Sequence, residues 1–187
     1  MANTVVNTSK LAAVRGGAHI YSAIYDTDLM NGAVGYIGEL DANTPGQETY
    51  KFGAFDADTL NKKKVVLVSH PEWSYQSGRS AQALDAYINK AGVPFRAFDL
   101  IDNDIFHISV EGINASDPAA IKVGAYVTVA ANSTQLNVVA NEQTAAANNF
   151  YGIIETKKID GMSVVAKNGT TYGKPMILYG IRVLKNA

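Results

Sequence analysis

Short runs in which apolar and polar residues alternate recur along most of the chain, and they restrict its fold more than any other feature. The alternation is clear in residues 20–25, 50–54, 106–110 and 123–129. Successive side chains of a strand point to opposite faces of its sheet, so a repeat of two indicates strands with one buried face. Turn signals such as Asn31-Gly32 separate the runs. The sequence therefore predicts a mostly β protein of the α+β class.

The middle of the chain departs from this pattern. Residues 65–68 are continuously apolar, which is typical of a strand covered on both faces. Residues 80–91 predict the one helix, because four apolar residues there repeat at helical spacing, with Ser80 as a cap and Gly92 at the end. Those four residues are Leu84, Tyr87, Ile88 and Ala91. Residues 95–100 resume strand character, so we expect a strand–helix–strand insertion, with a right-handed crossover if its strands are parallel.

The C-terminal part reads as further short strands. They are expected at residues 135–140, 150–157, 162–166 and 175–184, with Asn168-Gly169 as the hairpin turn before the last one. The last strand is apolar on both sides, so it is either central in its sheet or covered by another subunit. Many short strands at this spacing favour a small β-barrel or a β-sandwich.

The first residues form a segment of a different kind. Residues 1–16 are polar with scattered apolar positions and end at a glycine pair that favours a flexible joint. We interpret them as a flexible N-terminal arm that orders against a partner through Val5, Val6 and Leu11; an ordinary frayed terminus is the alternative. The remainder divides into an α+β lobe at 17–100 and a barrel-like lobe at 101–187, with the option that both share one core.

Charge and composition argue against two large classes of partner. The formal net charge is −1, so the basic surface expected of a nucleic-acid-binding protein is missing. Lys62-Lys63-Lys64 leads into a buried strand and is best read as a solvated approach to it. No apolar run reaches the roughly 18 residues of a membrane span, and the N-terminus does not resemble a signal peptide. We expect a protein made in a cytoplasm with no membrane partner.

The sequence gives little support for catalysis. The chain has no cysteine, which excludes thiolate metal sites, disulfides and a cysteine nucleophile. His70 and Glu72 follow a buried strand and form the best enzymatic candidate, but no nucleophile motif accompanies them. A positioned loop in which Trp73 packs is the preferred interpretation.

A metal site is equally weakly supported. Asp99, Asp102 and Asp104 could gather oxygen atoms around a calcium ion, but the remaining ligands of a calcium loop are missing. A solvated turn is therefore favoured at this point. We expect a protein with no catalytic residue, no metal and no cofactor.

An ordered series of strand, helix and turn segments spans roughly residues 20–130. Its members are Leu29–Val34, Val65–Glu72, the helix ending at Ala91-Gly92, Phe95–Leu100, Asp104–Ser109 and Ile121–Val127. This series resembles a family of tailed-phage virion proteins described as capsid decoration, cement or head-stabilising proteins.

The resemblance implies a structural virion protein on the outer surface of an assembled capsid, stabilising the contacts between capsomers. Its partners would be the major capsid protein and neighbouring copies of itself, with a homo-oligomer on the capsid as one arrangement. Candidate contact residues are Val5, Val6, Leu11, Trp73 and Tyr75. The alternatives are a tail-tube or head-completion protein and, from a different class, a carbohydrate-binding β module that would use Trp73 or Tyr75.

Overall fold

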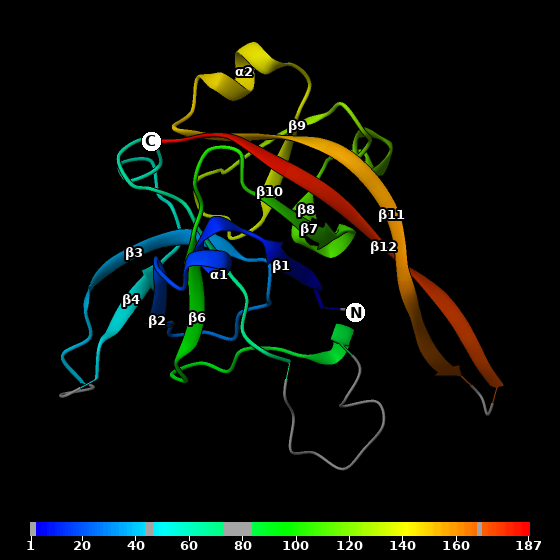
Figure 1. Cartoon of the computed structure of the whole chain (residues 1–187), viewed down its shortest axis with the longest axis horizontal. Coiled ribbons are helices and arrows are strands. Elements are labelled where there is room, and N and C mark those ends of the chain that lie inside the picture. The colour runs from blue at the N-terminus through cyan, green and yellow to red at the C-terminus, as the bar shows by residue number, and fades with distance from the viewer. Residues whose placement is uncertain (1–2, 44–46, 73–83, 168–169) are drawn as a thin grey trace.

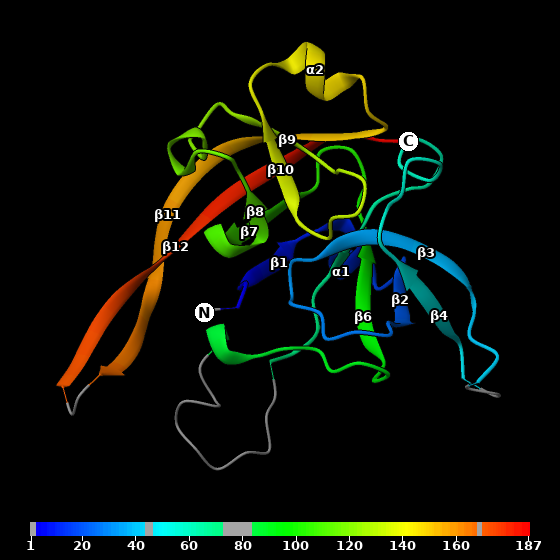
Figure 2. The same cartoon turned by 180° about the vertical axis from the view of Figure 1, so that it is seen from behind.

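A computed structural model describes residues 3–43, 47–72, 84–167 and 170–187, and it confirms a mostly β fold. Within these residues the strands form a closed five-stranded barrel and a seven-stranded sheet (Figures 1 and 2). The elements are β1 (Val6–Lys10), α1 (Ala12–Gly16), β2 (Ile20–Ile24), β3 (Val34–Leu40), β4 (Thr49–Gly53), β5 (Val66–Val68), η2 (Leu84–Ala86), β6 (Phe95–Asp99), β7 (Ile105–Ser109), η3 (Val110–Gly112), β8 (Ile113–Asn114), η4 (Pro118–Ala120), β9 (Tyr126–Thr128), β10 (Leu136–Val139), α2 (Glu142–Ala146), β11 (Phe150–Lys167) and β12 (Thr170–Asn186).

The barrel closes in the order β2-β4-β3-β5-β6. β2 and β4 run parallel, and the other neighbouring pairs are antiparallel. Aromatic rings fill much of its interior: the Phe52 ring meets Tyr25 at 5.5 Å and Phe95 at 5.7 Å, both edge to face. Such edge-to-face pairs add to the stabilisation from burial alone.

The sheet has the strand order β1-β7-β12-β11-β9-β10-β8. Its β12 lies between β7 and β11, and its successive residues Leu178 and Tyr179 are both buried, so both faces of the strand are covered there. Of the two interpretations of that strand, the central position is confirmed.

One hydrophobic core joins the barrel to the sheet. The barrel contributes Val34, Leu67 and Phe98, and the sheet contributes residues such as Phe106 and Ile181. All five side chains are buried, and Phe106 is inaccessible to solvent. The two groups of strands therefore pack on each other.

The N-terminal segment is not a free arm over its described residues. β1 pairs with the sheet strand β7, with Val6 opposite Ile108, and α1 follows it. The side chains of Val5, Val6 and Leu11 are buried, and Leu11 is completely inaccessible. The flexible-arm interpretation is wrong here, because these apolar side chains complete the core.

The expected helix at 80–91 is wrong for the residues that are described, and residues 73–83 lie outside them. Only the single 3₁₀ turn η2 forms, and Asn89 makes a β-bridge with Leu29. The Asn89 amide also donates to the Leu29 carbonyl (3.0 Å) and to the Asn31 side chain (3.0 Å). These bonds hold the backbone extended where the apolar spacing predicted a helical turn. β5 and β6 are antiparallel neighbours, so no crossover connects them.

The alternation at 106–110 and 123–129 predicts that the apolar side chains are buried and the polar ones exposed, and both runs differ from this. His107 and Ser109 are buried, whereas Val110 and Val123 are exposed. β7 lies between β1 and β12, and its polar face is covered as well as its apolar one. Val123 precedes β9, which begins only at Tyr126.

The strands expected at 150–157 and 162–166 form one strand, β11. Asp160-Gly161 falls at a register shift between Ile159 and Met162, so this pair marks a β-bulge rather than a turn. β11 and β12 together make a long hairpin that projects from the body of the molecule (Figures 1 and 2).

Candidate interaction surfaces

Residues 159–167 and 170–177 form a hairpin that we call the hairpin arm, and in the described part of the chain its two strands pair only with each other. β11 pairs with β9 through Tyr151–Ile153, and β12 pairs with β7 from Leu178 onward. Beyond these points the ladder continues from Ile159–Ile177 to Lys167–Thr170 between the two arm strands alone. Nine residues of extended chain reach roughly 30 Å. The arm therefore carries two unpaired strand edges far from the body.

The base of the hairpin arm exposes apolar surface. The Ile159 side chain is 69% exposed, the largest fraction among the exposed large hydrophobic residues of the described chain. Its ladder partner, Ile177, is partly buried. An isolated two-stranded hairpin is only marginally stable in water, and it is stabilised when a third strand or another surface covers it. The arm is thus a strong candidate for contact with a partner.

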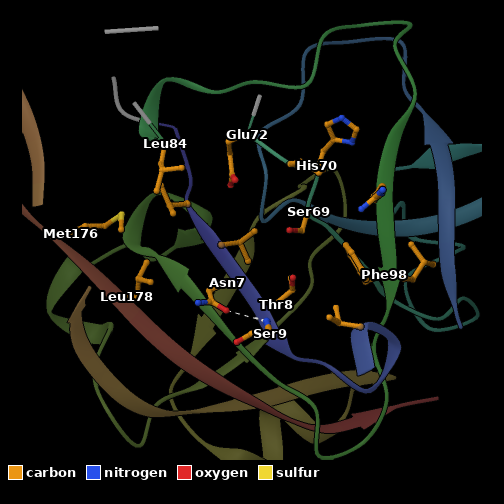
Figure 3. A pocket seen from close by; sticks show the side chains of 16 residues that line it. Asn7, Thr8, Ser9, Ser69, His70, Glu72, Leu84, Phe98, Met176 and Leu178 are labelled. Atoms are coloured by element: carbon orange, nitrogen blue, oxygen red, sulfur yellow. Dashed lines mark hydrogen bonds between the residues drawn. The ribbon is translucent and has the colours of Figure 1, made fainter. Parts of the chain in front are cut away.

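A groove of about 830 Å³ opens beside β1 and forms the second candidate surface. In Figure 3, Asn7, Thr8 and Ser9 of β1 lie across the groove from Ser69, His70 and Glu72. Met176 and Leu178, at the root of the hairpin arm, line its end (Figure 3). The groove thus runs between the sheet edge and the barrel.

One edge of β1 faces this groove, and none of the described strands pairs with that edge. β1 is the terminal strand of the seven-stranded sheet. The Ser109 N–H donates to the Val5 carbonyl at 2.9 Å and the Val5 N–H donates to Ser109 Oγ at 3.0 Å, so Val5 directs both backbone groups toward β7. Pairs alternate along such a ladder, so the next residue, Val6, directs its N–H and C=O away from β7. An extended segment in the groove could bond to these groups.

Exposed apolar side chains gather along the groove. Val14, Ile20 and Leu84 are 41%, 39% and 46% exposed, and all three line it. They come from α1, β2 and η2, so the fold brings together three segments that are distant in sequence. An exposed cluster of this kind, rimmed by polar groups, is typical of a binding surface.

The buried Asn31 fixes the loop that lines the groove opposite β1, at residues 69–72. Asn31 donates from Nδ2 to the His70 carbonyl (2.8 Å) and to Glu72 Oε1 (3.2 Å). Its Oδ1 accepts from the His70 N–H at 3.0 Å. These bonds hold the wall in place without any contribution from a bound partner, so the groove is already formed.

His70 supplies one polar atom with no established role. Its Nδ1 is buried and has no hydrogen-bond partner among the described residues. The ring stacks on Tyr87, with centroids 6.3 Å apart. Burial, and secondarily the positive charge of Arg96, lowers the pKa of His70 below its ordinary value. The imidazole is therefore held neutral at pH 7.

This lowered pKa predicts a pH dependence of stability. The unfolded chain binds the His70 proton at a higher pH than the folded chain does, so the stabilisation is complete above pH about 6.5 and is lost as the pH falls. We expect His70→Gln to show a smaller decrease in the free energy of unfolding between pH 7.5 and 5 than the unchanged protein. Urea unfolding at both pH values measures it, and equal decreases would contradict it. His19 and His107 are present in both proteins, so they do not contribute to the difference between the two decreases in unfolding free energy.

The expected site residues fall in three places. Val5, which directly precedes β1, and Val6, its first residue, line the groove although their side chains are buried, and Leu11 lies in the core. Trp73 and Tyr75 lie outside the described residues. The structure thus brings only Val5 and Val6 to a candidate surface, where their backbone is what a partner can reach.

The aspartates considered for calcium make backbone contacts instead. Asp104 is buried and accepts from the Ala12 N–H (2.7 Å) and the Ile101 N–H (3.0 Å). Asp102 accepts from the Asn186 N–H at 3.0 Å. The expectation of a solvated turn is wrong for Asp104, which fastens the N-terminal segment to the β6–β7 connection.

Comparison with known proteins adds no relative. The chain matches no protein-family model, no curated protein and no solved structure. In the described part of the chain, no three histidine, aspartate or glutamate side chains are grouped to hold a metal ion. Of the helices described, none is long and apolar enough to cross a membrane.

The two surfaces were not predicted from the sequence. A signal for the arm existed: residues 150–186 are strand-forming almost throughout, with the turn pair Asn168-Gly169 near the middle. Asp160-Gly161 concealed it by resembling a strand boundary. The groove had no local signal, because its walls come from segments far apart in the chain.

Proposed function

We propose that this chain is a structural virion protein that binds the outer surface of an assembled phage capsid and stabilises the contacts between capsomers. The observation that carries the proposal is the hairpin arm, whose strands pair only with each other and project from a folded body. A body that rests on one site while an arm reaches roughly 30 Å suits a protein that links neighbours on a lattice. The sequence resemblance supports the same function.

The expected energetics are those of many modest contacts. Each copy anchored on a shell holds its arm close to the next site, so the second contact forms at a high effective concentration. The exposed Ile159 at the arm base provides apolar area for such a contact. Occupancy of the shell would then depend on the arm even if the body makes the first contact.

Electron microscopy of empty capsids from the encoding phage tests this function. Capsids lacking the protein are incubated with the full chain or with a variant in which an Asn-Gly turn replaces residues 160–176 and joins the paired Ile159 and Ile177. We expect extra density on the outer surface with the full chain. The short-arm variant should need at least about 10-fold more protein for the same occupancy, because the second contact is lost.

A matched control changes exposed apolar surface away from the arm. Val93→Ser alters a side chain that is 53% exposed, and it should leave occupancy unchanged. Circular dichroism should show the same fold for all three proteins. Bare capsids at saturating full-length protein would refute the proposal, and rings or tubes formed without capsids would support a tail-tube function instead.

A further inference from the structure

We propose that the groove beside β1 receives an edge strand of the hairpin arm from a second copy of this chain, and that two copies exchange arms in this way. This proposal rests on the proposed function in one respect: in both, the hairpin arm contacts another protein molecule. It concerns contacts between copies, which can be measured in the absence of capsids.

The donor is the unpaired edge of the hairpin arm. In a two-stranded ribbon every second residue of each strand directs its N–H and C=O away from the other strand. From the Ile159–Ile177 pair outward, neither arm strand pairs with any other strand that the structure describes. Open edges of this type pair readily with another strand.

The acceptor is β1. Val6 directs its backbone groups toward the groove, and β1 has the length of an ordinary short strand. A strand added there would extend the sheet by one, and every second side chain of that strand would face one wall. Val14, Ile20 and Leu84 give the groove an apolar lining for these side chains. Ile159, 69% exposed at the arm base, offers an apolar side chain to this lining, whereas its ladder partner Ile177 packs against the core of its own chain.

A second copy fits this groove better than the arm of the same chain. The arm leaves its own body and runs away from it (Figures 1 and 2). Yet its root, at Met176 and Leu178, lines the end of the groove. Donor and acceptor are therefore adjacent on one molecule, and a two-fold axis beside the arm root would place each arm next to the other copy's groove.

The size of the contact agrees with a stable dimer. A standard interface uses about 20–30 residues on each side. The groove is lined by 16 residues, and the described arm residues 159–167 and 170–177, of which Met176 also lines the groove, add a similar number. Each copy therefore contributes a surface of that order.

Cross-linking between single-cysteine copies tests the exchange. The natural chain has no cysteine, so each introduced thiol is unique. Copies carrying Ile159→Cys are mixed with copies carrying Val14→Cys and treated with a flexible bismaleimide. The control replaces Val14→Cys by Val93→Cys, which is exposed but does not line the groove. We expect at least about five times more two-chain product from the first mixture.

Analytical ultracentrifugation of the unlabelled full chain provides the second readout. We expect dimers that are lost in the short-arm variant, at protein concentrations up to about 1 mM, the order that a lattice provides. A monomer over this whole range, or cross-linking equal to the control, would overturn the proposal. A monomer whose Val14→Glu variant nevertheless loses capsid occupancy would also overturn it and assign the groove to a strand of the shell protein. Bare capsids in the microscopy experiment would instead refute the proposed function.

Discussion

Replacing Asn186 by alanine should lower the free energy of unfolding by about 3–5 kcal/mol, because one buried amide satisfies three buried backbone groups. Asn186 Nδ2 donates to the carbonyls of Val65 (2.9 Å) and Leu100 (2.7 Å), and Oδ1 accepts from the Val65 N–H (2.9 Å). This side chain therefore ties the end of β12 to the barrel. Alanine leaves all three groups without a partner. Urea unfolding followed by circular dichroism measures the loss.

Asn114→Ala is the matched control. Asn114 is exposed and loses a single bond to the Asn137 side chain, so its effect should stay below about 1 kcal/mol. Asn186→Asp should cost at least as much as Asn186→Ala, because it retains the acceptor for the Val65 N–H but places a buried carboxylate oxygen against the carbonyls of Val65 and Leu100. A decrease below 1 kcal/mol for Asn186→Ala would show that water satisfies the exposed backbone groups.

Phe106→Ala should cost about 3–5 kcal/mol and should weaken the barrel as well as the sheet. Phe106 is completely inaccessible to solvent and belongs to the core that both groups of strands share. Removing its ring leaves a cavity between them, and one cooperative core predicts one unfolding transition. Amide signals of Leu67 in the barrel and Ile154 in the sheet should disappear at the same urea concentration, shifted equally by the substitution.

Separate unfolding transitions of the barrel and the sheet would contradict this prediction. If the Leu67 signal kept its midpoint while that of Ile154 shifted, the barrel and the sheet would unfold independently, and residues 100–101 would mark a true domain boundary. Val123→Ala is the control, because this side chain is 54% exposed and should cost little.

The positions of most strands could be predicted because alternation is a local property. The runs at 20–25, 50–54 and 95–100 became β2, β4 and β6 with nearly the expected limits. Which strands pair with each other could not be predicted from the alternation. The parallel contact of β2 with β4, for example, depends on closure of the barrel, which a local pattern does not specify.

Two errors have one physical cause, the effect of tertiary contacts on an ambiguous local pattern. The apolar residues at 84–91 have helical spacing, but the Asn89–Leu29 bridge fixes an extended backbone there. Val5, Val6 and Leu11 looked too sparse for a core, yet β7 and its neighbours supply the rest of the apolar surroundings. In both cases the deciding partner is far away in the sequence.

The candidate surfaces illustrate the same limit. Val5 and Val6 were predicted as partner contacts through their side chains, whereas the structure places those side chains in the core and the backbone of β1 along the groove. The extent of the arm is set by where β9 stops pairing with β11, at Ile153, and where β7 stops pairing with β12, at Leu178. Strand propensity alone does not reveal such a point.

A density map of decorated capsids at side-chain resolution would examine most directly whether the hairpin arm links neighbouring copies on a shell. We predict that density for residues 159–177 of one copy lies along β1 of the next copy, beside Val14, with the bodies on the outer capsid surface. Arms that end in solvent, or a shell without this protein, would contradict that prediction.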